Sequence, residues 1–370
     1  MDTTITFISE LYQGQLSPLR DQVEYEHILG DIKCFGAEAQ IYHMLREQEL
    51  MNAVPDFFTK ELKRRVDPVL FQNLFIKSEQ KKILTAFEQQ GIPVIQLKGV
   101  WFTERYFKHI SARATSDIDL LVHPEDVQKS EDILSELGFH FEEGDPAHFH
   151  ILLAKSYDNP LYSRLETEIH WNISRQNNSN TEIDYFWSES SLISNYTYVR
   201  ELSLQQTFYH ICLHGISHHM SSLKYILDIL QLIHYYGDDM DYERLLHQAS
   251  SDHNYSKVVL ALSLVYKLFP YLQERKPLSV HKKYPLWSMD LARRVMQEQK
   301  DIRYFFFRVS SAFATYDTWK HKLSSLRYIL FPPQVYFKHE IGEEKSVIKS
   351  YFKLYLSVVR TWLNAKSKTL

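Results

Sequence analysis

Apolar residues recur at helical spacing through the first 90 positions of the chain. The clearest case is a set at positions i, i+7, i+8 and i+11, namely Ile76, Ile83, Leu84 and Phe87. This spacing places the four side chains on one face of a helix. Gly91 and Pro93 then interrupt the pattern. From about Leu202 onward the helical spacing returns, so the pattern predicts two helical regions with a different segment between them.

The segment between the helical regions alternates short β-prone stretches with helical ones. Strands are expected at residues 94–97, 116–122, 139–142, 149–154 and 165–171. Helices are expected at 101–109 and from Pro124 to Leu137, where Gly138 would end the second helix. This order predicts an α+β fold, in which a small mixed sheet forms a core between largely helical N-terminal and C-terminal regions. The corresponding limits are residues 1–74, 75–200 and 201–370.

Composition supports a globular, helix-rich chain. Of its 370 residues, 44% are hydrophobic and 24% are charged, which is too apolar for a disordered protein. Gly occurs at 10 positions, and such a low content favours helices over a loop-rich β protein. The net charge of −4 lacks the basic surplus that general nucleic-acid binders carry.

The cysteine content and the lengths of the apolar runs bear on where in the cell the protein is located. The two cysteines, Cys34 and Cys212, form neither a metal-binding pair nor a disulfide framework, which suits a reducing compartment. The first residues lack the basic start and long apolar stretch of a signal peptide. The longest clean apolar run of the C-terminal half, Val258 to Tyr266, is less than half of a membrane span. We therefore expect a cytoplasmic protein without stable membrane insertion.

Two aspartates share one face of the strand expected at 116–122. Because strand side chains alternate between faces, Asp117 and Asp119 point to one side and Ile118 points to the other. Neighbouring carboxylates repel each other, and unpaired charges in an apolar strand are costly. A divalent cation between them removes that cost. Mg²⁺ suits such a place, since it binds one or two carboxylates together with water and substrate phosphates.

The strand expected at 165–171 supplies further acids. Glu166, Glu168 and His170 alternate onto one of its faces. If this strand lies beside the first, one of the two glutamates completes a cluster of three carboxylates. Such a cluster can hold two metal ions, of which one activates an acceptor hydroxyl and the other stabilises a leaving pyrophosphate. The strand pattern alone leaves both glutamates open as the third acid.

These residues belong to a longer pattern of motifs. Residues 91–99 read GIPVIQLKG, residues 113–122 read RATSDIDLLV, and residues 168–171 read EIHW. Two later motifs are LHGISH at 213–218 and LKYILDI at 223–229. This order resembles a family of bacterial nucleotidyltransferases within the superfamily typified by DNA polymerase beta. The resemblance extends over about residues 75–235.

The resemblance implies an enzyme that transfers a nucleoside monophosphate from an NTP, such as ATP, to a hydroxyl or phosphate acceptor and releases pyrophosphate. It implies two Mg²⁺ ions, or Mn²⁺ in their place. The catalytic and metal-binding residues that it implies are Asp117, Asp119 and Glu168. The turn at Lys98 and Gly99 is expected to open a helix that meets the triphosphate. Arg113 is expected to contact phosphate or nucleotide.

Other polar residues near these motifs have two interpretations. The family pattern implies substrate-binding or supporting roles for His170, His214, His218, Lys224 and Asp228. A purely structural interpretation stays open for each of them. Lys224 and Asp228 are four residues apart and would form an ordinary ion pair on a helix. Arg113 would in that case pair with Asp117 or Glu104.

The sequence therefore predicts a metal-dependent nucleotidyltransferase that takes an NTP as donor. A small-molecule acceptor is favoured over RNA or protein, because the chain lacks a basic surplus. One alternative is an enzyme of the nucleotidyltransferase-like toxin type that modifies tRNA or a protein. The other is a non-catalytic binding module that has kept the fold. The acidic residues argue against this second alternative, because a site without catalysis has little need for paired carboxylates.

Overall fold

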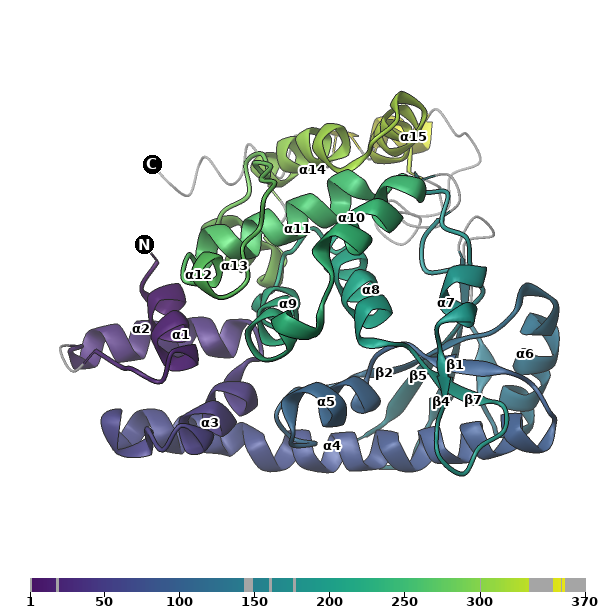
Figure 1. The fold of residues 1–370 in the computed structure, drawn as a ribbon, viewed down its shortest axis with the longest axis horizontal. Helices are drawn as coiled ribbons and strands as arrows, with labels where there is room; N and C mark the ends of the chain where they lie inside the picture. Colours follow the sequence, from purple (N-terminus) through teal and green to yellow (C-terminus); the bar gives the residue numbers. More distant parts are fainter. Residues whose placement is uncertain are drawn as a thin grey trace.

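The structure is a computed structural model of the chain (Figure 1). It describes residues 2–17, 20–142, 149–159, 162–175, 178–299, 301–332, 349–353 and 355–356. Residues 357–370, at the end of the third expected region, lie outside the described residues. The combination of helices with one mixed sheet confirms the expected α+β class.

The described N-terminal residues form helices, as predicted. These are α1 (Thr3–Tyr12), α2 (Gln22–Cys34), α3 (Glu38–Glu47) and α4 (Asp56–Gln89). The side chains of Asp2 and Asp21 cap α1 and α2 by accepting hydrogen bonds from backbone N–H groups of the first turn. The long α4 runs along the bottom of the molecule beneath α5 (Val100–Phe107) and the sheet (Figure 1). The limit expected between residues 74 and 75 falls inside α4.

Seven described strands form one sheet in the order β3-β4-β5-β2-β1-β7-β6. Their bounds are β1 (Val94–Gln96), β2 (Asp117–Leu121), β3 (His140–Phe141), β4 (His150–Ser156), β5 (Arg164–His170), β6 (Ser191–Leu192) and β7 (Val199–Glu201). The pairs β2–β5 and β1–β7 are parallel, and the other pairs are antiparallel. The first five strands were predicted. The short strands β6 and β7 were not predicted.

Short helices connect the strands. The helix expected at 101–109 is α5, and the one expected to begin at Pro124 is a 3-10 turn, Pro124–Asp126, followed by α6 (Val127–Glu136). Gly138 ends that segment with a φ of 85°, a left-handed conformation that favours glycine. α7 (Asp184–Ser188) precedes the last two strands.

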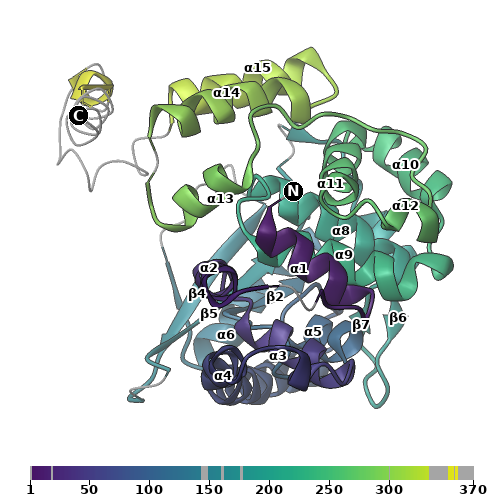
Figure 2. The same ribbon diagram turned by 90° about the vertical axis from the view of Figure 1, so that its left-hand side faces the viewer.

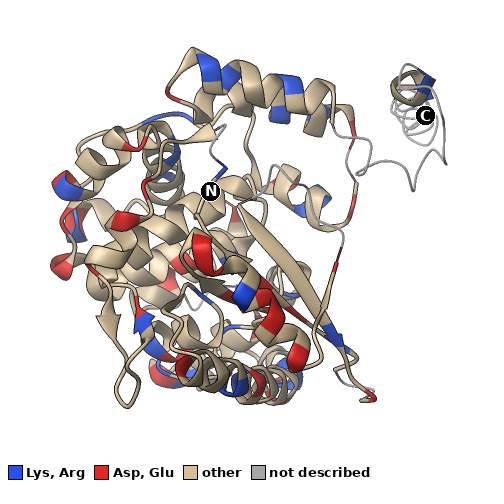
Figure 3. Ribbon diagram, turned by 90° about the vertical axis from the view of Figure 1, so that its right-hand side faces the viewer, with Lys and Arg blue, Asp and Glu red and all other residues tan. Residues whose placement is uncertain are grey.

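The described part of the C-terminal region is largely helical, as predicted. Its helices are α8 (Leu204–Ser217), α9 (Leu223–Tyr236), α10 (Tyr242–Ser251), α11 (Tyr255–Leu268), α12 (Leu272–Arg275), α13 (Met289–Met296), α14 (Ile302–Thr315) and α15 (Trp319–Leu330). α14 and α15 contain Lys and Arg but no Asp or Glu (Figure 3). Within the described part of the chain, no helix combines the length and apolar character needed to cross a membrane. The cytoplasmic location stays a prediction.

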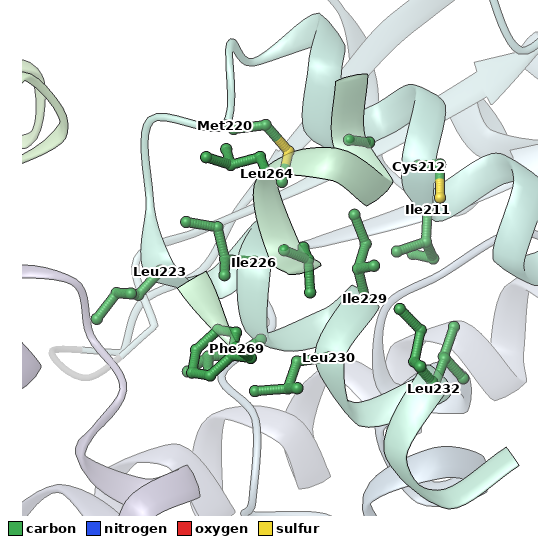
Figure 4. Packing of buried hydrophobic residues seen from close by; sticks show 14 of the residues in the cluster. Ile211, Cys212, Met220, Leu223, Ile226, Ile229, Leu230, Leu232, Leu264 and Phe269 are labelled. Carbon is green, nitrogen blue, oxygen red and sulfur yellow. The ribbon is translucent and has the colours of Figure 1, made fainter. Parts of the chain in front are cut away.

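The two largest hydrophobic clusters among the described residues hold these parts together. The larger cluster joins the N-terminal helices to the C-terminal helices, which lie next to each other in Figure 2. It includes Ile5 of α1 and Leu230 of α9, both fully buried, and Figure 4 shows its α8, α9 and α11 side chains. The smaller cluster packs α4 against one face of the sheet, with Phe87 beside Leu120 and other strand residues. The opposite face of β2 and β5 is therefore the one that carries polar groups.

Candidate active site

The candidate site is built on the parallel pair β2–β5. In their register Asp117 lies opposite Glu166, and Asp119 lies opposite Glu168. The strand alternation explains the arrangement, because Ile118 points into the cluster beneath the sheet while its two acidic neighbours point to the other face. The expected adjacency of the two acidic strands is therefore present in the structure.

Three carboxylates converge on this face. Asp117, Asp119 and Glu168 each offer one oxygen, and these oxygens lie within 4.8 Å of one another. The side chain of Asp119 is completely buried, while those of Asp117 and Glu168 are 25% and 26% exposed. Glu166 is not part of this group; its carboxylate pairs with Arg164 at 3.1 Å and is 46% exposed. The geometry thus groups Glu168, rather than Glu166, with the two aspartates.

Lys98 lies between the two aspartates. Its Nζ is 3.0 Å from Oδ2 of Asp117 and 2.5 Å from Oδ2 of Asp119. Burial lowers the pKa of Lys98, but the charges of the two aspartates outweigh it and the pKa lies above its ordinary value. Burial likewise raises the pKa of Asp119, but Lys98 and His170 outweigh it and the pKa is lowered. These groups therefore hold one another in their charged forms.

Gly99 allows Lys98 to approach the acids. It stands at the N-cap of α5 with φ 84° and ψ −142°, a conformation that is essentially restricted to glycine. A Cβ at this position would lie 3.3 Å from the backbone oxygen of Asp117. The turn expected at Lys98 and Gly99 therefore does open a helix, and it does so in close contact with β2.

His170 connects two of the three acids. Its Nε2 is 3.2 Å from Oδ1 of Asp119 and 3.0 Å from Oε2 of Glu168. Burial lowers the pKa of His170, but the two hydrogen-bonded carboxylates outweigh it and raise the pKa to about 9. Burial raises the pKa of Glu168, and the hydrogen bond and charge of His170 outweigh it, so that this pKa lies below its ordinary value.

His150 lies beside Glu168 and His170, and its pattern in the sequence did not predict this. It lies directly opposite His170 in the antiparallel pair β4–β5. His150, Glu168 and His170 each offer one ligand atom within 4.8 Å of the others. The strand that contains His150 was predicted, but its pairing register with β5 depends on contacts that a single sequence does not display.

Arg113 and Asp228 form a buried pair. Nε and Nη2 of Arg113 donate to the two carboxylate oxygens of Asp228 at 2.7 and 2.8 Å, and both side chains are less than 5% exposed. In the described structure Asp228 therefore pairs with Arg113 rather than with Lys224, and Glu104 pairs with Lys77. The contact between Arg113 and phosphate stays a prediction.

Lys224 lies in the first turn of α9, close to this pair. Burial and the charge of Arg113 lower its pKa to about 8, although Asp228 and Asp117 act in the opposite direction. Its ammonium thus belongs to the electrostatic surroundings of the acidic cluster. A substrate-binding role for Lys224 stays a prediction.

Two histidines at the C-terminal end of α8, His214 and the C-cap residue His218, make a separate set of ring contacts. The rings of His214 and His218 lie 4.7 Å apart, and His218 stacks on Tyr225 at 5.0 Å. Burial and the charge of Lys98 lower the pKa of His214. Neither histidine belongs to the possible metal-binding groups found among the described residues. Their substrate-binding role stays a prediction as well.

The pattern of this chain matches a known protein family. Residues 36–270 match the family described as "Uncharacterised nucleotidyltransferase". The chain belongs to this family. The match includes all seven strands and every residue of the acidic cluster. For this nucleotidyltransferase, the expected fold class and the expected transferase activity are therefore confirmed.

Two solved structures of the antibiotic-resistance factor ANT(2'')-Ia are similar to the chain. The crystal structure in complex with adenylyl-2''-tobramycin is 17% identical with a TM-score of 0.28, and it covers 54% of this chain and 97% of that chain. The solution structure is 18% identical with a TM-score of 0.29, and it covers 56% of this chain and 94% of that chain. A comparison with curated proteins gave no match.

Proposed function

We propose that the chain transfers a nucleoside monophosphate from an NTP to a hydroxyl or phosphate acceptor, with release of pyrophosphate. The convergence of three carboxylate oxygens within 4.8 Å, on a chain of a nucleotidyltransferase family, is the observation that carries this proposal. Asp117, Asp119 and Glu168 are the proposed catalytic and metal-binding residues. They come from neighbouring parallel strands, so the sheet backbone holds them in a fixed arrangement.

The donor set fits a divalent cation. Carboxylate oxygens are the ligands that Mg²⁺ prefers, and Mn²⁺ accepts the same ligands. Oδ2 of Asp119 is buried and lies 2.5 Å from the ammonium of Lys98, so this oxygen already faces a positive charge. Two Mg²⁺ ions bound here would supply a Lewis acid for the acceptor oxygen and a counter-charge for the pyrophosphate. Asp119 is proposed to bind metal through this oxygen.

The other charged residues have proposed roles in binding the donor. Lys98 pairs with both aspartates, and its ammonium lies where it is available to the triphosphate. The backbone N–H groups at the start of α5 lie in the same turn and suit a phosphate oxygen. The Arg113–Asp228 pair connects the segment before β2 to α9, which would hold Lys224 beside the acids.

A small molecule is the proposed acceptor. The net charge of −4 supports this choice, because an enzyme that holds RNA through its phosphates benefits from a basic surplus. Products formed from labelled NTP with a small-molecule extract, with total RNA and with lysate protein would separate these acceptor classes. Label recovered only in RNA or only in protein would contradict the proposed acceptor while leaving the transfer activity in place.

The first experiment measures nucleotide binding, which needs no acceptor. The thermal midpoint is recorded with Mg²⁺ and each of the four NTPs for the wild type and for Asp117→Asn, Glu168→Gln and Glu166→Gln. A ligand at hundredfold excess over its Kd stabilises the folded state by about 2.7 kcal/mol. We expect a Mg²⁺-dependent increase for the wild type and for Glu166→Gln, the matched control, and none for the other two variants. An unchanged increase in both Asp117→Asn and Glu168→Gln would contradict the assigned site.

A further inference from the structure

Two histidines and one glutamate lie together at one end of β4 and β5. His150 is opposite His170 across the antiparallel pair, and Glu168 is two residues before His170 on the same face. One ligand atom from each lies within 4.8 Å of the other two. Glu168 is thus common to this group and to the three-carboxylate group on its other side.

His170 has one ring nitrogen that the acids do not satisfy. Its Nε2 contacts Asp119 and Glu168, while its Nδ1 is buried and has no hydrogen-bond partner among the described residues. A buried polar atom without a partner is costly, so it points to a missing ligand. In the neutral tautomer with the proton on Nε2, the Nδ1 lone pair is open to a metal. The contact from Nε2 to the carboxylate of Asp119 is the support that metal-binding histidines usually have.

We propose that His150, Glu168 and His170 form a second metal site, which takes a divalent transition metal such as Mn²⁺, Fe²⁺, Co²⁺ or Zn²⁺ rather than Mg²⁺. Imidazole nitrogens suit these ions, whereas Mg²⁺ prefers oxygen ligands. Two histidines with one carboxylate also leave coordination positions open for water or substrate. The site rests on the proposed function only through Glu168, the ligand that both groups share.

The three proposed ligands differ in how far their side chains are buried. His170 is 5% exposed and fixed by its two acids, whereas Glu168 is 26% exposed and His150 is partly buried. Glu168 and His150 are therefore more exposed than His170, which its acidic neighbours hold in place. The competing interpretation is a polar network in which His170 merely holds the two acids in place, and metal binding distinguishes the two.

The test measures metal binding to the full chain, without nucleotide. After removal of metals with chelator, Co²⁺ is titrated in the presence of excess Mg²⁺ and followed by visible absorption. Nitrogen coupling to bound Mn²⁺ is measured by pulsed electron paramagnetic resonance. The variants are His150→Ala, His150→Gln and the matched control His140→Ala, since His140 is an exposed histidine on the adjacent strand β3.

Loss of a ligand should weaken Co²⁺ binding by about tenfold or more in both His150 variants and leave it unchanged in His140→Ala. The nitrogen coupling should be present in the wild type and reduced in the His150 variants. Equal Co²⁺ affinity in the wild type and in folded His150 variants would overturn the proposal. Absence of nitrogen coupling in the wild type would overturn it as well.

Asp117→Asn separates this site from the proposed function. Asp117 belongs to the carboxylate group alone, so this variant should lose the NTP-dependent thermal shift and keep the nitrogen coupling. A wild type that binds no NTP but shows the coupling would contradict the proposed function and support the second site. A wild type that binds Mg²⁺–NTP but shows no nitrogen coupling would support the proposed function and contradict the second site.

Discussion

The end of β5 and the middle of α8 each bury a histidine, with opposite electrostatic results. His170 of β5 and His210 of α8 have the same exposure, 5%. The pKa of His170 is raised to about 9, whereas the pKa of His210 is lowered to about 3. Burial alone therefore does not decide the charge of a histidine in this protein.

The neighbours of the two rings explain the difference. His170 donates to Asp119 and Glu168, whose charges outweigh the cost of burying an imidazolium. His210 has no hydrogen-bond partner for either ring nitrogen among the described residues, and burial lowers its pKa together with the nearby positive charges of Lys98 and His170. At the end of β5, the charged groups around His170 therefore stabilise one another. His210 of α8 has no such partner and stays neutral.

A nuclear magnetic resonance titration of the histidines in chelator-treated protein tests this contrast directly, and its expected effect is the largest. His170 should lose its proton near pH 9, while His210 should stay neutral down to about pH 3. Asp119→Asn removes one charged partner, so the pKa of His170 should fall in that variant while that of His210 stays low. Similar pKa values for both histidines in the wild type would contradict the comparison.

Asp228→Asn extends the contrast to a second paired charge, with the next largest effect. Arg113 would keep its buried charge but lose its carboxylate partner, and breaking a buried pair in this way costs about 3–5 kcal/mol. Urea unfolding of the two proteins measures the loss in free energy of unfolding. Glu61→Gln, which breaks the more exposed Lys33–Glu61 pair, is the matched control and should change stability far less.

His43→Gln probes a buried neutral histidine, with the smallest effect of the three. His43 of α3 contacts Oγ of Ser111 and is 2% exposed, and burial lowers its pKa to about 4. Because the unfolded chain binds the proton more tightly, the stabilising contribution of neutral His43 is complete above pH 6.5 and is lost as the pH falls toward 4.

The loss from this one group between pH 8 and pH 5 is about 2 kcal/mol. Urea unfolding at the two pH values should therefore show that His43→Gln loses less stability on acidification than the wild type. The other buried histidines still contribute to both proteins, so the difference between the two proteins is the quantity to compare. Equal losses would show that His43 titrates normally in the folded state.

Local sequence patterns were sufficient for most of the secondary structure. The regular spacing of apolar residues predicted the N-terminal and C-terminal helices, and short β-prone stretches predicted β1 to β5. β6 and β7 were missed because they form by pairing with β1 and with each other, which depends on contacts between distant residues. The expected limit after residue 74 marked the start of the expected core segment, whereas α4 continues through it as one helix.

The sequence by itself determined which side chains share a face of each strand, because the two-residue alternation is a property of the local backbone. It thus placed Asp117 with Asp119, and Glu168 with His170. Only the tertiary structure decided which strands are neighbours and in which register, since that depends on contacts between residues far apart in the chain. Those contacts place Glu168 beside Asp119 and His150 opposite His170. They also pair Arg113 with Asp228.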